Sequence, residues 1–365
     1  MIGVRKETER VRARTVKDGH ALLEVHDLQV EIPLPRGRLH AVRGVSLQVD
    51  AGEAVGVVGE SGSGKSLTLR ALLGLLPHPA RLTGGSILLD GVDVTGLPER
   101  RRRQVLTEAM SMVFQDSLTA LNPVMRVGDQ IAEVPRRRFG MSRSEAHARA
   151  VELMDRVGIP DPEKRFRAYP HELSGGMRQR VCIAIALSAA PRLILADEPT
   201  TALDVTIQAQ VLDVIDTLRR DEQLGLVLVS HDLAVISQTC SRVYVMYAGR
   251  VVESGEIRAV LTGPRHPYSF ALLRSVPDPD APVHRLLTIP GQPPSLTAAH
   301  SGCSFAPRCA FAQEQCTAEE GDPGLVPVAA GESAEGHHDS ACLRWETAPE
   351  WDDTSLPVDA LERRS

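Results

Sequence analysis

The sequence predicts an α/β fold built around a largely parallel β-sheet, and three observations lead to this prediction. Apolar runs typical of strands alternate with stretches of helical periodicity between about residues 22 and 260. A glycine-rich loop joins one such strand directly to a helix. Further along, the strand-like runs "RLILAD" (192–197) and "GLVLVS" (225–230) flank a long helical stretch, which is the pattern of parallel strands joined by a crossover helix.

The first half of the chain begins with a charged arm and then becomes rich in strand signals. Residues 1–20 have no apolar central region, so we expect a flexible arm rather than a secretory signal. The runs "ALLEVHDLQVEI", "GVSLQV" and "EAVGVVG" predict strands, and "KSLTLRALLGLL" predicts a helix directly after the third. Residues 98–172 are polar and arginine-rich with helical periodicity, which predicts a helical insertion into the sheet core.

The second half ends in a region with few recognisable elements. The segment "RVYVMYAGRVVESG" (242–255) predicts a hairpin that turns at Gly249. Beyond about residue 262 proline and glycine become frequent, and the last residues have the composition of a disordered tail. The predicted division of the chain is an arm (1–20), a main α/β domain (21–262), an irregular C-terminal module (263–347) and a tail (348–365).

Charge and hydropathy exclude several classes of protein. A net charge of −6 over 365 residues argues against general affinity for nucleic acid, which needs a basic surface. No run approaches the ~20 apolar residues that span a bilayer, and the longest candidate is "VCIAIALSAA" (181–190). We therefore expect a cytoplasmic protein whose membrane role comes through partners. A reducing cytoplasm also disfavours structural disulfides.

The segment "GESGSGKS" (59–66) matches the pattern G-x-x-x-x-G-K-[ST] between an apolar strand and a helix, the context that a phosphate-binding P-loop requires. Its glycines let successive backbone N–H groups point at phosphate oxygens, and the helix N-terminus adds positive charge. We expect Lys65 to reach the β- and γ-phosphates of ATP and the Ser66 hydroxyl to bind Mg²⁺. The residues predicted to bind the nucleotide are Gly59, Glu60, Ser61, Gly62, Ser63, Gly64, Lys65 and Ser66.

The run "LILADEPT" (193–200) predicts a buried strand that ends in two carboxylates. In open α/β sheets, ligands bind at the carboxyl ends of the strands, so we expect Asp197 and Glu198 to lie beside the P-loop. Asp197 suits a place in the shell of the Mg²⁺ ion. Glu198 suits the polarisation of an attacking water, which makes it the candidate catalytic base.

The segment "LSGGMRQR" (173–180) resembles the signature of ATP-binding cassette (ABC) ATPases, with Met177 in place of the usual glutamine. The resemblance implies a P-loop ABC ATPase fold: a RecA-like parallel sheet core, an antiparallel β subdomain and a helical insertion. It also implies that two cassettes pair head to tail. Ser174, Gly175 and Gly176 would then bind the nucleotide that the partner's P-loop holds.

Three further positions match this family. Gln115 in "MVFQDSLTALNP" matches the Q-loop, which implies a catalytic role and contact with Mg²⁺. Asp204 in "TALD" matches the D-loop at the nucleotide, and His231 in "VLVSHD" matches the switch histidine that contacts the γ-phosphate. Ile32 stands where the family usually stacks adenine on an aromatic residue, with His40 as an alternative nearby. We therefore expect a weaker or less base-selective nucleotide site.

The C-terminal segments "RHPYSFALLRSVP" (265–277), "IPGQPPSL" (289–296) and "GCSFAPRC" (302–309) resemble the extension of oligopeptide/dipeptide/nickel importer ATPases, above all the peptide-transport D subunit. The resemblance implies an ATP-hydrolysing subunit at the cytoplasmic face of the cell membrane. Its implied partners are two permease subunits, a second and different ATPase subunit and, indirectly, an extracytoplasmic solute-binding protein. An importer of nickel or another small solute is one alternative, and a soluble cassette ATPase is another.

The C-terminal cysteines follow the pattern C-x5-C-x6-C, with a fourth after a gap. No C-x2-C knuckle is present, but four thiolates suit either Zn²⁺ or a [4Fe–4S] cluster. The family resemblance implies a cluster, with zinc or no metal as the alternatives and with His337 and His338 as alternative ligands. Cys182 and Cys240 lie in apolar runs and are expected to be inert core thiols. The candidate ligands are Cys303, Cys309, Cys316 and Cys342.

Overall fold

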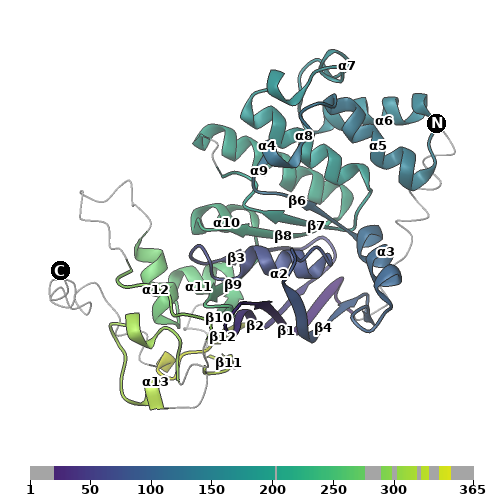
Figure 1. Ribbon diagram of the computed structural model, residues 1–365. Coiled ribbons are helices and arrows are strands. Elements are labelled where there is room, and N and C mark those ends of the chain that lie inside the picture. Colours follow the sequence, from purple (N-terminus) through teal and green to yellow (C-terminus); the bar gives the residue numbers. More distant parts are fainter. Residues whose placement is uncertain are drawn as a thin grey trace.

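The computed structural model describes residues 20–201, 204–275, 289–297, 302–318, 322–328 and 337–346. The predicted arm, apart from His20, and the predicted tail lie outside these ranges. Figure 1 shows a helical layer above the main sheet, a second sheet below it and the C-terminal module at one side. Within the described part of the chain, no helix is long and apolar enough to cross a membrane.

The main sheet has the strand order β11-β12-β10-β9-β3-β8-β7-β6. The neighbouring strands from β9 to β6 pair in parallel, which confirms the predicted α/β class. These strands are β3 (Ala54–Val58), β6 (Met110–Val113), β7 (Leu193–Asp197), β8 (Gly225–Ser230) and β9 (Arg242–Tyr247). Every residue of β3, β7 and β8 is buried, because helices cover both faces of the sheet, and this explains their unbroken apolar sequences.

Successive residues of a central strand enter two different hydrophobic cores. Leu226 and Leu228 of β8 pack with the helices on one face of the sheet, α8 (Gly175–Ser188), α9 (Val205–Glu222) and α10 (Leu233–Thr239). Val227 and Val229 pack on the other face, where α2 (Lys65–Leu72) separates the main sheet from the second sheet. Because strand side chains alternate between the two faces, α2 packs against the main sheet on one side and against the second sheet on the other.

The second sheet is antiparallel, with the order β2-β1-β4-β5. Its strands are β1 (Leu23–Pro33), β2 (Arg38–Val49), β4 (Arg81–Leu89) and β5 (Val92–Asp93). This sheet is the antiparallel subdomain that the family resemblance implies.

One strand of the main sheet was not predicted from the sequence. The stretch 98–172, expected to be helical, includes β6, which pairs in parallel with β7 at the edge of the main sheet. Only four residues long, β6 directly follows an arginine-rich helix and is too short to break the helical periodicity. The other elements of the stretch are α3 (Glu99–Ala109), α4 (Ser117–Ala120), α5 (Val127–Phe139), α6 (Arg143–Arg156), α7 (Pro162–Arg165) and η1 (Pro170–Glu172).

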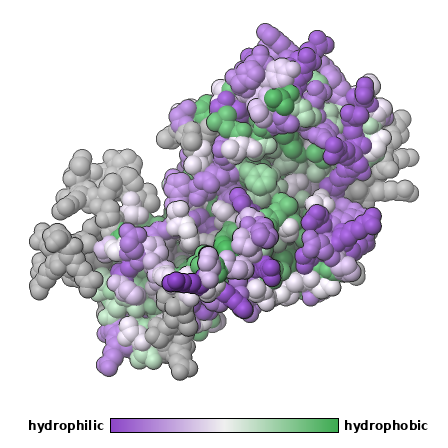
Figure 2. Space-filling model, in the orientation of Figure 1, coloured by the Kyte–Doolittle hydropathy of each residue, from purple (hydrophilic) through white to green (hydrophobic). Residues whose placement is uncertain are grey.

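The C-terminal module is attached to the main sheet by hydrogen-bonded strands. The predicted hairpin forms with β10 (Arg250–Glu256), and β10 in turn pairs with β12 (His338–Ser340), an extension that the sequence did not indicate. The remaining elements are α11 (Ile257–Thr262), α12 (Pro267–Arg274), η2 (Ala306–Arg308), α13 (Gln315–Ala318) and β11 (Val326–Pro327). Figure 2 shows a mostly hydrophilic surface on the viewed face, with hydrophobic patches near the middle of the molecule.

Candidate functional site

The P-loop connects β3 to α2, as its sequence context predicts. Gly62 and Gly64 adopt positive φ angles of 81° and 103°, which glycine reaches without steric cost. A Cβ atom on Gly64 would lie 2.7 Å from the carbonyl oxygen of Ala41. The loop is therefore folded tightly against β2, and a side chain at this position would force the two segments apart.

Lys65 begins α2 and folds back across the loop. Its Nζ donates hydrogen bonds to the carbonyl oxygens of Gly59 at 2.7 Å and Glu60 at 3.0 Å. Burial lowers the pKa of Lys65, whereas the negative charges of Glu198 and Asp197 raise it. The ammonium thus lies within the field of both carboxylates of "LILADEPT", as expected for residues that share one site.

Ser66 and Asp197 are direct neighbours. Ser66 Oγ donates a hydrogen bond to Asp197 Oδ1 at 2.8 Å, and Asp197 is the last residue of β7. Burial raises the pKa of the Asp197 carboxyl, partly offset by the hydrogen bond from Ser66. A hydroxyl and a carboxylate are hard oxygen ligands of the kind that Mg²⁺ prefers, so the pair fits this ion.

Glu198 is the centre of a second cluster. Its Oε2 accepts hydrogen bonds from Gln115 Nε2 at 3.0 Å and from Thr201 Oγ1 at 2.9 Å, and His231 Nδ1 lies 3.3 Å from the same oxygen. Gln115, Glu198 and His231 follow the neighbouring strands β6, β7 and β8. The structure therefore brings together three sequence-predicted residues; Thr201 was not among the predicted site residues.

The signature segment forms the start of α8. Ser174 is the N-cap, and its Oγ accepts a hydrogen bond from the Met177 N–H at 3.3 Å. Gly176 packs so closely on α9 that a Cβ atom would lie 2.6 Å from Ile207 Cγ2. Asp204 caps α9 by accepting from the Ile207 N–H at 2.9 Å, which places Asp204 beside the signature.

The signature and the P-loop do not form one site within the chain. Among the described residues, no hydrogen bond or ion pair joins Ser174, Gly175 or Gly176 to residues 59–66. Met177, at the position of the usual glutamine, is partly buried and packs against the hydrophobic core.

Two other candidate residues near the site make contacts within the chain. The N–H of Glu60, a residue of the predicted nucleotide-binding loop, donates to Tyr268 Oη at 2.7 Å, and its carboxylate pairs with Arg308. His40, the alternative base-stacking residue, has its Nδ1 3.2 Å from Glu31 Oε1. Tyr268 and Arg308 lie in the C-terminal segments that resemble the transporter extension, but the sequence did not indicate their contacts with the loop, because these contacts arise only from the tertiary fold.

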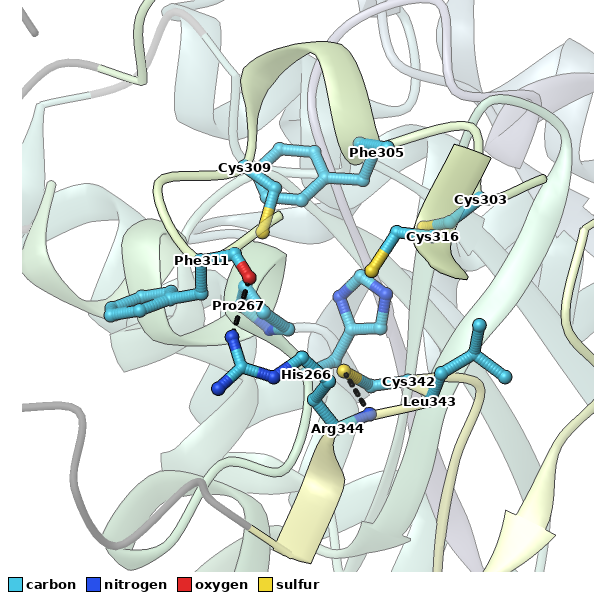
Figure 3. Close-up of a pocket in the computed structure, with 11 residues that line it drawn as sticks. His266, Pro267, Cys303, Phe305, Cys309, Phe311, Cys316, Cys342, Leu343 and Arg344 are labelled. Atoms are coloured by element: carbon cyan, nitrogen blue, oxygen red, sulfur yellow. Dashed lines mark hydrogen bonds between the residues drawn. The ribbon is translucent and has the colours of Figure 1, made fainter. Parts of the chain in front are cut away.

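The four C-terminal cysteines line one cavity, together with His266 and Phe305 among others (Figure 3). Burial is the main cause that raises the pKa of Cys309 to about 12, and the charges of the other three cysteines add to it. Among the described residues, however, no group of three or more His, Cys, Asp or Glu side chains is placed to hold a single metal ion. The lining cysteines are Cys303, Cys309, Cys316 and Cys342.

The two histidines considered as alternative ligands are engaged elsewhere. His338 Nε2 lies 2.7 Å from Glu253 Oε1 in the protein interior, and His337 Nε2 lies 2.6 Å from Asp339 Oδ2. The expectation that either histidine is an alternative metal ligand is therefore wrong, since neither side chain lines the cysteine cavity. Cys182 and Cys240 are buried in the core as predicted, and burial raises the pKa of both thiols.

Comparisons with known proteins show which family the chain resembles. The sequence profile of the ABC transporter family matches residues 42–201, and that of the oligopeptide/dipeptide transporter C-terminal region matches residues 252–316. The oligopeptide transport ATP-binding protein OppD of Salmonella typhimurium is 48% identical over 297 residues, which cover 81% of this chain and 88% of that protein. The dipeptide transport ATP-binding protein DppD of Escherichia coli is 43% identical over 318 residues, covering 87% and 97%.

Solved structures share the fold of the cassette. The ATP-binding cassette MJ0796, solved as a dimer bound to ADP and Pi, superimposes with a TM-score of 0.58 and 26% identity, covering 65% of this chain and 99% of that chain. The cbiO1 protein of Clostridium perfringens gives the same TM-score and identity over 67% and 91%. On these matches, the chain belongs to the ABC transporter family as an ATPase of the oligopeptide/dipeptide transporter type.

Proposed function

We propose that the chain is the ATP-hydrolysing subunit of an importer of oligopeptides or dipeptides and acts at the cytoplasmic face of the cell membrane. The observation that carries this proposal is the convergence of Gln115, Glu198 and His231 beside the P-loop, in a chain whose relatives are named peptide-transport ATP-binding proteins. ATP hydrolysis at a site with these groups would provide the energy for transport. The match of the C-terminal region to the oligopeptide/dipeptide transporter family supports the transport role.

The arrangement supports in-line attack of water on the γ-phosphorus of ATP. Lys65 would bind the β- and γ-phosphates, and Ser66, Asp197 and Gln115 would hold Mg²⁺, which would supply positive charge to stabilise the transferring phosphoryl group. Glu198 orients the water and takes its proton as the bond to the β-phosphate breaks, releasing ADP and inorganic phosphate. The three hydrogen-bonding neighbours of Glu198 fix the direction of its carboxylate.

A complete site requires a second cassette. Because Ser174, Gly175 and Gly176 lie apart from the P-loop, they are available to a nucleotide on another chain, and α8 offers its N-terminus for that purpose. We propose that ATP closes this head-to-tail pair and that hydrolysis releases it, which moves the membrane subunits between their two states. The second cassette is a different chain of the same family.

The segment after Gln115 is proposed to contact the permease subunits. Leu118 and Val124 are large apolar residues exposed on this segment, close in sequence to a residue that bonds Glu198. Exposed apolar side chains of this kind mark protein–protein contacts when they gather on one surface. A contact here would connect the movement of the permeases directly to the catalytic carboxylate.

Uptake measurements in cells test both the function and this surface. Deletion of the gene is expected to abolish uptake of a labelled dipeptide and a labelled tripeptide, and to leave Ni²⁺ uptake unchanged. A copy carrying Leu118→Asp and Val124→Asp should fail to restore uptake, since loss of such interface anchors costs on the order of 2 kcal/mol each. The matched control carries Leu75→Asp and Val92→Asp, two exposed apolar residues elsewhere, and should restore uptake fully.

The outcomes separate the alternatives. Loss of Ni²⁺ uptake with intact peptide uptake would replace the proposed cargo by nickel. Unchanged uptake of all three solutes in the deletion strain would reject the transport function. Full restoration by the Leu118/Val124 variant would reject only the permease contact.

We also propose that the four C-terminal cysteines hold a [4Fe–4S] cluster. A single Zn²⁺ ion needs all its thiolates at about 2.3 Å from one point, whereas a cluster binds each cysteine at a different iron. Four thiols that line one cavity supply the number and type of ligands that such a cluster requires. The cluster would act as a structural staple between the "GCSFAPRC" segment and Cys342.

Anaerobic purification tests this proposal. We expect brown protein containing about four iron and four sulfide per chain, and its loss in a Cys309→Ser variant. Cys182→Ser, at a buried cysteine outside the cavity, is the matched control and should keep the full iron content. Colourless protein with bound zinc would favour the zinc alternative, and metal-free protein would reject both.

A further inference from the structure

An ion pair joins the cysteine-bearing segment to the P-loop. Arg308 Nη1 lies 2.7 Å from Glu60 Oε2, and Arg308 Nη2 lies 2.9 Å from Glu60 Oε1. Two parallel N–H···O bonds of this kind combine strong attraction with a fixed relative orientation. Arg308 ends the short helix η2 and immediately precedes Cys309 in the chain, whereas Glu60 is the second residue of "GESGSGKS".

The guanidinium of Arg308 is held rigidly by its other contacts. Its Nε donates to the Pro290 carbonyl at 2.8 Å, Nη2 to the Ile289 carbonyl at 3.2 Å, and Nη1 to Tyr247 Oη at 3.3 Å. Only 4% of the side chain is exposed to solvent. Because each nitrogen has a protein partner, the charge is fixed in place opposite Glu60 and cannot follow it if the P-loop moves.

Glu60 itself is anchored at each of its polar groups. Its N–H donates to Tyr268 Oη at 2.7 Å, and its carbonyl accepts from Lys65 Nζ at 3.0 Å. Tyr268 is wholly buried and belongs to α12, so that both Tyr268 and Arg308, which anchor Glu60, come from the C-terminal module. The module thus determines where the first turn of the P-loop lies.

The negative charge of Glu60 affects Lys65, the residue expected to bind the phosphates of ATP. The Glu60 carboxylate lies close enough to Lys65 to raise the pKa of that ammonium. Without a compensating cation, the carboxylate would attract Lys65 away from phosphate oxygens and repel the anionic nucleotide. Arg308 supplies this compensation from a position that solvent scarcely reaches, where screening is weak.

We propose that Arg308 is a positioning residue for nucleotide binding: it holds and neutralises the P-loop carboxylate of Glu60, and thereby makes nucleotide affinity depend on the C-terminal module. The role concerns binding and not the chemical step, since Arg308 touches neither Glu198 nor its partners. It requires that the chain binds ATP, but it does not depend on the transported solute or on the content of the cysteine cavity.

Calorimetric titration of the full-length chain with Mg²⁺–ADP tests the proposal, because ADP is not consumed. Arg308→Met is expected to weaken ADP binding about tenfold, the effect of one unpaired charge several ångströms from the phosphates. Glu60→Gln alone should strengthen rather than weaken ADP binding, because it removes a negative charge near the phosphates and leaves the positive charge of Arg308 in place. In the Glu60→Gln/Arg308→Met double variant, which carries neither charge, the affinity should return to within about threefold of that of the wild type.

The double variant separates the proposed role from simple loss of structure. If Arg308 served only to pack the C-terminal module, the double variant would bind as weakly as Arg308→Met, and the proposal would be rejected. Arg308→Lys, which keeps the positive charge without the two-point geometry, should lie between wild type and Arg308→Met. In steady-state hydrolysis, Arg308→Met should raise KM and leave kcat within about twofold, as expected for an interaction with the ground state.

A second two-point pair provides the matched control. Arg242 Nη2 lies 2.8 Å and 2.7 Å from the two carboxylate oxygens of Glu53, at the opposite end of the parallel strands from the P-loop. Arg242→Met should lower the melting temperature but leave the Kd for ADP unchanged. Equal weakening of ADP binding by Arg242→Met and Arg308→Met would overturn the proposal. Absence of ADP binding by the wild-type chain would instead contradict the ATPase assignment.

Discussion

Replacing Glu198 with glutamine is expected to lower the rate of ATP hydrolysis by about 10²–10⁴-fold, the usual contribution of a general base. Glutamine has the same shape but accepts no proton at neutral pH. The amide can still pair with Gln115, Thr201 and His231, so the pocket should keep its shape and ATP should bind with nearly unchanged affinity. The variant is therefore expected to accumulate in the ATP-bound state.

The measurement is steady-state phosphate release alongside ATP binding at equilibrium. Because the partner ATPase would supply a second site, its corresponding glutamate is neutralised in the same assay. Glu256→Gln, an exposed glutamate at the end of β10, is the matched control and should hydrolyse ATP at the normal rate. Near-normal hydrolysis by the Glu198→Gln variant would contradict the catalytic role given to this residue.

Replacing His338 with leucine is expected to destabilise the chain by about 3–5 kcal/mol, the usual cost of removing one partner of a buried pair. The side chains of Glu253 and His338 are 0% and 2% exposed, and they lie 2.7 Å apart. Glu253 also accepts hydrogen bonds from the N–H groups of Arg265 and His266, at 2.6 Å and 3.0 Å. Without His338, the hydrogen bonds left to the buried carboxylate within the described part of the chain would be those from these two N–H groups.

Urea denaturation followed by circular dichroism measures this loss. The neighbouring residue offers a close control, because His337 also pairs with a carboxylate but its side chain is 61% exposed. His337→Leu should cost no more than about 1 kcal/mol, since solvent screens such surface pairs. Equal effects of the two substitutions would show that burial does not determine how much the Glu253–His338 pair contributes to the free energy of unfolding.

The strands that form the core and the residues at their carboxyl ends were predictable for a common reason. A strand that is buried on both faces must be apolar throughout, so β3, β7 and β8 stand out in the sequence. Parallel strands end at the same edge of the sheet, which is why Glu198 and His231 could be expected together although β7 and β8 are separated by a long helix.

The features that the sequence did not predict depend on tertiary partners. The strand β12 has the polar sequence "HDS", and it forms because β10 offers it an edge and Glu253 offers His338 a partner. Arg308 and Glu60 are 248 residues apart in the chain, and nothing in either local sequence indicates that they meet. Local patterns report burial and backbone preference, whereas such pairs are set only when the whole chain has folded.

Arg43 connects three parts of the fold that are far apart in the sequence. This residue of β2 donates to Ser304 Oγ, and its Nη2 lies 2.7 Å from Asp322 Oδ2, while its backbone N–H donates to the Gly249 carbonyl. Arg43 therefore holds the antiparallel sheet, the hairpin turn and the C-terminal module together at one point. A C-terminal module exchanged between relatives must therefore keep all of these contacts. A module that lacked them would leave the charge of Arg43 in the cassette unpaired.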